Sequence, residues 1–203
     1  MISRNRKPLE YFGYGLYLYF SGLSLRRASE RLACCFIKRN HVSIWNWIQK
    51  HRPQRILIKR KKILEYVVDE TLLKVGSAFV WLWVAIEPKN MEILALSISK
   101  ERNMLVAERF ISGLVQIHGK HPVSTDGGTW YPQACRFLNL DHHIHSAFEK
   151  SLIERTIMQY IKDRTESFDD YFPCRLKNCK LKHVLNWLNL FVDHHNSELK
   201  MLK

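Results

Sequence analysis

The stretch Leu64–Val75, LEYVVDETLLKV, decides the fold of this chain, because it places two adjacent acidic residues inside a β-rich apolar run. Val, Tyr and Thr are enriched in strands, so we predict a strand over 64–75. A second run with two tryptophans, FVWLWVAI at 79–86, predicts the next strand. The turn residues EPKN at 87–90 and a third apolar run at 92–99 complete a predicted antiparallel meander.

The chain beyond the meander alternates between helical and extended patterns. Apolar residues recur with helical spacing over 105–118, and a short strand is predicted over 122–125. We also predict a strand over 142–145 and helices over about 151–162 and 181–194. This order of elements predicts an α/β fold, a mixed sheet with flanking helices.

The charge is divided unevenly along the chain. The 203 residues carry a net charge of +13, and residues 1–62 hold 15 Lys and Arg against only Glu10 and Glu30. Residues 63–203 hold 17 basic and 17 acidic side chains. We therefore predict three segments, a basic domain at 1–52, a basic connector at 53–62 and a neutral domain at 63–203. A basic module is typical of proteins that bind a polyanion such as nucleic acid.

The basic domain contains the pattern of a helix-turn-helix. Apolar residues recur with helical spacing from Leu25 to Cys35, and Ser24 is the predicted N-cap. A second short helix over 42–50 buries Ile44, Trp47 and Ile48, with Asn40 as its predicted cap. Two short helices joined by a tight polar turn are typical of DNA-binding modules, and a helical hairpin with a solvated basic face is the alternative. The predicted DNA-binding side chains are Arg26, Arg27, His41, Asn46, Gln49 and Lys50.

The sequence disfavours a membrane or secreted protein. Its most apolar early stretch, 11–20, is far shorter than the roughly 20 residues that span a bilayer. No small-residue cleavage site follows an apolar core, and an odd number of cysteines, five, is typical of reduced intracellular thiols. We therefore expect no membrane partner and a cytoplasmic location.

Three carboxylates are the candidate catalytic residues. Asp69 lies in an apolar strand, where a carboxylate is costly unless it is paired or binds metal. Asp126 follows a predicted strand and precedes two glycines, and Glu154 lies beside the apolar face of a predicted helix. Each alone also fits an ordinary explanation, a strand-end Asp, an Asp-Gly turn or a half-buried Glu. Together they can hold two Mg²⁺ or Mn²⁺ ions for phosphodiester chemistry.

The order and spacing of these segments resemble the DDE-type insertion-sequence transposases, close to the IS-six group with its short one-piece catalytic domain. The resemblance covers nearly the whole chain. Its segments are VDET at 68–71, STDG at 124–127, LIER at 152–155, KDRT at 162–165, SLR at 24–26 and IWNW at 44–47.

This resemblance implies a ribonuclease H-like catalytic domain whose metal triad is Asp69, Asp126 and Glu154 rather than the neighbouring Glu70 or Glu149. Strand alternation separately distinguishes Asp69 from Glu70, since successive side chains point to opposite faces.

The resemblance also implies cofactors and partners. It implies two Mg²⁺ (or Mn²⁺) ions, a homodimer that joins two element ends, and DNA partners that comprise terminal inverted repeats and target DNA. It further implies replicative insertion in a prokaryotic, nucleoid-associated setting. Lys162 and Arg164 are the candidates to hold DNA phosphate near the metals.

Two departures from the family pattern keep other functions open. The interval from Asp126 to Glu154 is shorter than usual, and the basic residue expected at Ile161 stands at Lys162. Both favour an alternative, a catalytically inactive DNA-binding remnant of a transposase. A metal-dependent DNA nuclease without strand transfer is a third interpretation that keeps the triad.

Histidines and cysteines in the C-terminal half suggest a zinc site as one further interpretation. Four residues separate Cys174 from Cys179, and histidines stand at 142, 143, 145, 194 and 195. This spacing matches no common zinc finger or ribbon, so scattered buried residues are the favoured explanation. His143 and His145 share a predicted strand face and are candidates to support the active site.

Overall fold

The structure is a computed structural model that describes residues 9–35, 38–51, 63–75, 78–154, 161 and 181–201. The chain divides into two compact units. One contains Met1–Pro53 and Asn186–His194, and the other contains Gln54–Leu185 and His195–Lys203. No helix in the described ranges is both long and apolar enough to cross a bilayer.

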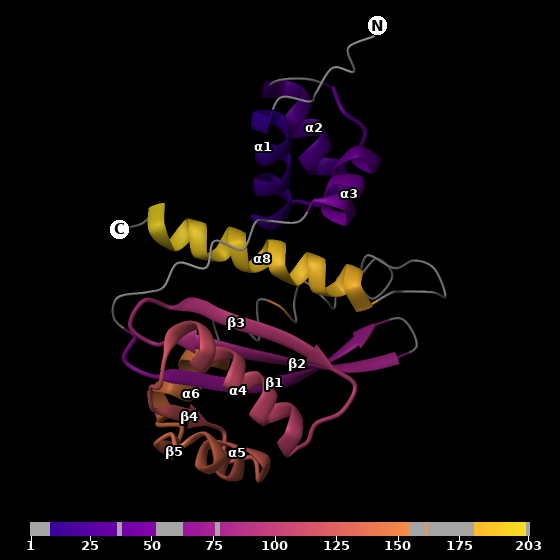
Figure 1. Ribbon diagram of the computed structural model, residues 1–203. Helices are drawn as coiled ribbons and strands as arrows, with labels where there is room; N and C mark the ends of the chain where they lie inside the picture. Colours follow the sequence, from indigo (N-terminus) through magenta and orange to yellow (C-terminus); the bar gives the residue numbers. More distant parts are fainter. Residues whose placement is uncertain are drawn as a thin grey trace, which may run out of the picture. The chain divides into compact units, whose positions relative to one another are not determined.

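The first unit contains three N-terminal helices, α1 (Leu9–Phe20), α2 (Leu25–Cys35) and α3 (His41–Lys50) (Figure 1). The Ser24 hydroxyl accepts a hydrogen bond from the backbone N–H of Arg27 at 3.3 Å, and this bond starts α2. The Asn40 side chain accepts from the backbone N–H of Val42 at 3.3 Å and starts α3. Both predicted helices and both predicted caps are therefore present, whereas α1 was not predicted as a helix.

The core of this unit uses residues from both ends of the sequence. Ile44, Trp47 and Ile48 of α3 are buried, as their helical spacing predicts. The segment 186–194 of α8 (Leu181–Met201) adds Trp187, which is 1% exposed and whose indole N–H donates to the Tyr19 hydroxyl at 3.0 Å. The N-terminal sequence alone therefore does not supply this core.

The second unit is built on a five-stranded sheet of order β3-β2-β1-β4-β5. The strands β1 (Tyr66–Val75), β2 (Ala78–Glu87) and β3 (Glu92–Ser99) form the antiparallel meander that the sequence predicts. The short strands β4 (Val123–Thr125) and β5 (His142–Ile144) extend the sheet in parallel with β1. The predicted mixed sheet is confirmed, and its parallel half places β4 beside the first residues of β1.

Between the meander and residue 154 the structure describes three helices, α4 (Met104–His118), α5 (Trp130–Leu138) and α6 (Ala147–Ile153). Figure 1 shows α4 and α5 packed side by side against the sheet, and Ile111 of α4 and Tyr131 of α5 share one core with Trp83 of β2. The sequence analysis places no helix at 130–138, where Pro132 stands in the first turn. Proline is tolerated there because the first backbone N–H groups of a helix need no intrahelical acceptor.

The helix α6 differs from its prediction over 151–162. It begins earlier, at a capping box in which Ser146 and Glu149 satisfy each other's backbone N–H groups. Residues 155–160 and 162 lie outside the described part of the chain. The last helix, α8, is longer than predicted and continues to Met201.

Candidate active site

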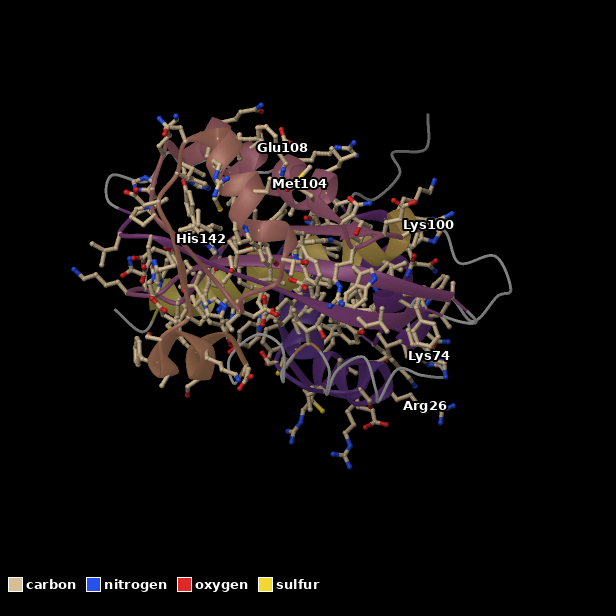
Figure 2. All side chains as sticks on the ribbon, turned by 90° about the horizontal axis from the view of Figure 1, so that it is seen from below. Arg26, Lys74, Lys100, Met104, Glu108 and His142 are labelled. Carbon is tan, nitrogen blue, oxygen red and sulfur yellow. The ribbon has the colours of Figure 1, made fainter. Side chains whose placement is uncertain are left out.

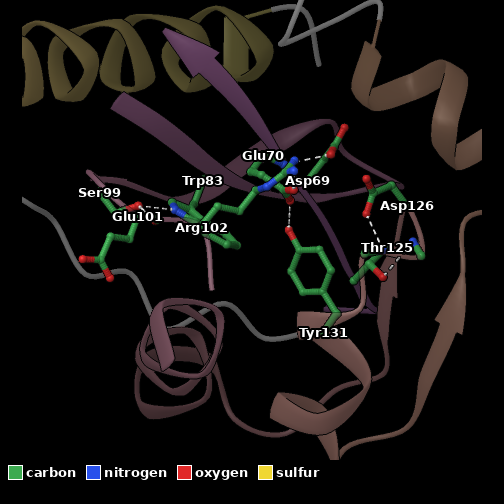
Figure 3. A network of polar contacts seen from close by, with 11 residues as sticks. Asp69, Glu70, Trp83, Ser99, Glu101, Arg102, Thr125, Asp126 and Tyr131 are labelled. Carbon is green, nitrogen blue, oxygen red and sulfur yellow. Dashed lines mark hydrogen bonds and ion pairs between the residues drawn. The ribbon is translucent and has the colours of Figure 1, made fainter. Parts of the chain in front are cut away.

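Two of the three predicted carboxylates converge in the second unit. Asp69 lies within β1, and Asp126 directly follows β4, the parallel neighbour of β1. One carboxylate oxygen from each of Asp69, Glu70 and Asp126 lies within 4.8 Å of the others (Figure 3). Asp126, at the carboxyl end of β4, therefore lies beside the middle of β1, where Asp69 stands.

The turn after β4 fixes the position of Asp126. Gly127 has a φ of +91°, a left-handed conformation that side chains other than glycine rarely adopt. The backbone N–H of Gly128 then donates to Oδ1 of Asp126 at 3.0 Å. The two glycines therefore let the backbone turn back and hold the Asp126 carboxylate toward Asp69.

The environment of Asp69 disfavours its charged form. The pKa of Asp69 is raised to about 7, chiefly by burial and also by the nearby charges of Asp126, Glu70 and Glu154. A hydrogen bond from the Glu70 backbone N–H at 2.8 Å opposes this rise. A partly buried group of carboxylates without a cation carries this electrostatic cost. All its donors are oxygens, the ligands that Mg²⁺ and Mn²⁺ prefer, so the residues present fit a hard divalent cation.

Glu70 belongs to the same acidic group but already has two partners. Its carboxylate is buried and accepts hydrogen bonds from the Tyr131 hydroxyl and from Nη1 of Arg102, the latter at 3.4 Å. The Arg102 guanidinium lies between two indole rings, 4.1 Å from the centroid of Trp81 and 4.3 Å from that of Trp130. Figure 3 shows Tyr131 and Arg102 reaching Glu70 from different elements.

The carboxylates of Asp69 and Glu70 meet although strand alternation directs the two side chains to opposite faces of β1. Glu70 is on the face of Tyr66 and Val68, which share a core with Tyr131 of α5. The Asp69 side chain folds back to accept from the backbone N–H of Glu70, and an oxygen of each carboxylate lies within 4.8 Å of the other. Glu70 therefore differs from Asp69 both in the face of the sheet and in its hydrogen-bond partners.

Glu154 lies at the margin of this group. It is the C-cap of α6, is exposed, and is not a member of the set of ligand atoms within 4.8 Å of one another. Its charge nevertheless contributes to the raised pKa of Asp69, so it lies on the same side of the domain. Lys162 and Arg164 lie outside the described residues.

The predicted DNA-binding side chains of the first unit differ in exposure. Arg26 and Arg27 on α2 and Lys50 on α3 are exposed, and Arg26 projects from the surface in Figure 2. His41 and Asn46 are half-buried. The amide nitrogen and oxygen of Gln49 are both buried without a hydrogen-bond partner, in contrast to the surface position that its DNA-facing role requires.

Sequence reasoning missed the residues that hold Glu70. Tyr131 is 61 positions from Glu70 and lies on the helix that was not predicted, and Arg102 follows β3 in a loop. A single Tyr or Arg carries no periodic signal in a sequence. The aromatic pair Trp130-Tyr131, one residue after the TDGG segment, is the local feature that could have pointed to Tyr131.

Comparison with known proteins identifies the family. A family model described as a DDE domain, of the transposase type, matches residues 64–172, more than half of the chain. The chain belongs to the DDE transposase family. An uncharacterized protein of Methanocaldococcus jannaschii is 32% identical over 197 residues, which cover 97% of this chain and 90% of that protein.

Solved structures share the fold of this DDE transposase. A chain of the simian T-cell lymphotropic virus intasome in complex with the PP2A regulatory subunit B56 gamma aligns with a TM-score of 0.51 at 17% identity, over 92% of this chain. This chain spans 64% of the length of that chain. The magnesium complex of the HTLV-2 integrase catalytic core domain, in its dimeric form, aligns with a TM-score of 0.47 at 17% identity, over 65% of this chain and 87% of that one. The family match and the alignment at a TM-score of 0.51 confirm the predicted ribonuclease H-like fold.

Proposed function

We propose that this chain is a DNA transposase that binds the ends of its own insertion sequence and catalyses metal-dependent strand cleavage and strand transfer. The observation that carries the proposal is the convergence of Asp69 and Asp126 in a chain of the DDE family. Cleavage and transfer are both in-line displacements at phosphorus, so one site serves both steps.

Asp69 and Asp126 would hold the divalent cations, with Glu154 as the third ligand. Two Mg²⁺ or Mn²⁺ ions, when bound, supply Lewis-acid polarisation of the scissile phosphodiester. Asp69 must lose its proton before it binds a cation, and its raised pKa makes this loss a condition for assembly of the site. Tyr131 and Arg102 act through Glu70 and keep this segment of β1 in place while the charge of the site changes.

DNA binding is divided between the two units in this proposal. The first unit binds the terminal inverted repeats through the exposed side chains of the predicted set, with phosphate attraction from Arg26 and Arg27. Lys162 and Arg164 hold DNA phosphate near the metals. A homodimer pairs the two element ends, in the cytoplasm of a prokaryote.

The decisive experiment is a cleavage and joining assay on element-end DNA. With Mg²⁺ or Mn²⁺, we expect Asp69→Asn and Asp126→Asn to reduce both reactions by roughly 100-fold or more, since each removes a metal ligand. Glu108→Gln, which changes a carboxylate on α4 outside the acidic group, is the matched control. Full activity of Asp69→Asn would refute the assignment.

The position of Glu154 supports a second candidate, a DNA-binding protein without catalytic activity. Glu154 is exposed at the end of α6 and outside the compact acidic group. Specific binding of the wild-type protein to element ends, without cleavage in either metal, would establish this candidate. Cleavage without joining of a pre-cut 3′-OH end would instead identify a nuclease that lacks strand transfer.

A further inference from the structure

A second group of metal-ligating side chains lies in the sheet-containing unit, apart from the acidic group of Asp69. Its members are Glu65, His143 and Glu149, and one ligand atom from each lies within 4.8 Å of the other two. Glu65 directly precedes β1, His143 lies on β5, and Glu149 lies in the first turn of α6. Three separate elements therefore meet at one imidazole and two carboxylates.

The two distances from His143 are long for N–H···O hydrogen bonds, and the shorter one, to Glu149, makes only a weak hydrogen bond. Nε2 of His143 lies 3.3 Å from Oε1 of Glu149 and 3.5 Å from Oε2 of Glu65. A ring nitrogen carries at most one hydrogen, and N–H···O bonds span about 2.7–3.2 Å. Ligand atoms bound to Zn²⁺ at about 2.0–2.1 Å in a tetrahedron lie about 3.3–3.4 Å apart. The observed distances match the edges of such a tetrahedron.

The Glu149 carboxylate is held so that one oxygen faces His143. Its other oxygen, Oε2, accepts hydrogen bonds from the Ser124 hydroxyl at 2.9 Å and from the Ser146 backbone N–H at 2.6 Å. Such partners orient a carboxylate before a metal binds and are typical of the surroundings of metal ligands. The His143 side chain is 45% exposed, which leaves an entry path for an ion.

The charge of this group also favours a cation. The carboxylates of Glu65 and Glu149 lie against one imidazole, with a ligand atom of each within 4.8 Å of the other. Two neighbouring carboxylates repel each other when both are ionised, and a divalent cation between them removes this repulsion.

We propose that Glu65, His143 and Glu149 bind one divalent transition-metal ion, of which Zn²⁺ is the best match. An imidazole with two carboxylates suits Zn²⁺ or Mn²⁺ better than Mg²⁺, and three protein ligands leave one position for water. Glu149 lies in the first turn of α6, and Glu154, the third catalytic carboxylate of the proposed function, is the C-cap of the same helix. The ion ties the start of this helix to β1 and β5, a structural role that does not depend on catalysis.

The test is a zinc titration of the full-length, metal-free protein in saturating Mg²⁺, which occupies sites that prefer oxygen ligands. We expect one equivalent of Zn²⁺ by calorimetry and a rise in Tm, both absent in Glu65→Gln and His143→Gln, whose zinc affinity should fall by roughly 100-fold or more. The controls are His121→Gln, which changes another histidine of the same unit, and the double variant Asp69→Asn with Asp126→Asn. All controls should keep the zinc.

Two outcomes would overturn the proposal. One is the absence of zinc binding at micromolar concentration in the wild-type protein. The other is zinc that persists in His143→Gln and Glu65→Gln but is lost in Cys174→Ser or Cys179→Ser, since this would place the ion at the cysteines. Circular dichroism and Tm of each variant in EDTA separate a lost site from a lost fold. Co²⁺ absorption in Glu65→Gln, whose side chain is partly exposed, gives a second readout.

Discussion

Removal of the Asp69 carboxylate should stabilise the metal-free protein while it abolishes the proposed catalysis. The folded protein holds the pKa of Asp69 at about 7, against 3.8 for an ordinary aspartate, with burial as the largest cause. Each pKa unit is worth about 1.4 kcal/mol, so ionisation of Asp69 costs the folded state ~4 kcal/mol at most. Asp69→Asn keeps the shape of the side chain and removes this charge.

The pH dependence of stability follows from the different pH values at which Asp69 loses its proton in the folded and in the unfolded chain. Below about pH 4 Asp69 is protonated in both the folded and the unfolded chain, and its ionisation has no effect on stability. Between about pH 4 and pH 7 the folded chain keeps a proton that the unfolded chain has lost, so stability falls as the pH rises. The advantage of Asp69→Asn should therefore grow from near zero at pH 4 to roughly 2–4 kcal/mol at pH 8.

Urea unfolding in EDTA at these two pH values measures this difference directly. The comparison of variant with wild type cancels titrations that both proteins share, and Glu108→Gln controls for the loss of any carboxylate. Mg²⁺ should reduce the advantage at pH 8, because only the wild type keeps the full set of ligands and gains stability from binding. Equal stability of variant and wild type at pH 8 in EDTA would refute the electrostatic account of the site.

Three further substitutions test other parts of the structure. Tyr131→Phe removes the hydroxyl that donates to the buried Glu70 carboxylate. It should lower the free energy of unfolding, measured in urea, by roughly 1–3 kcal/mol. An unchanged free energy would contradict a stabilising role for this hydrogen bond. Ser146→Ala removes the side-chain acceptor of the α6 capping box and should lower the free energy of unfolding by about 1 kcal/mol. Amide hydrogen exchange should become faster in α6 alone. Trp187→Ala should lower the free energy of unfolding by about 3–5 kcal/mol and speed amide hydrogen exchange in α1. Unchanged slow exchange in α1 would show that the core of the first unit does not need Trp187.

The sequence predicts those parts of the fold whose signal is local. The strands β1, β2 and β3 and the helix α4 have continuous apolar patterns, and each lies within two residues of its predicted bounds. The helix α5 was missed because WYPQACRFL combines aromatic residues with a proline, which predict a helix only weakly.

The candidate site was predictable only in part, because only some of its residues belong to a local sequence pattern. Asp69 and Asp126 stand at strand positions that a pattern can locate, and they converge. The contacts of Glu70 with Tyr131 and Arg102, and of Tyr19 with Trp187, join residues far apart in the chain. Such contacts depend on the packed tertiary structure and leave no local trace. The place of Glu154 depends on where α6 begins and ends, which helical periodicity defines poorly.

The contribution of 186–194 to the first unit has a consequence for the order of events during synthesis. N-terminal domains generally fold first as a chain leaves the ribosome. Here α1, α2 and α3 are made early, but Trp187, which packs beside Phe20 with their ring centroids 5.5 Å apart, is translated only after all five strands of the sheet. The core of the first unit is therefore completed only after the sheet-containing segment has been synthesised. A product truncated before Trp187 would lack this part of the core.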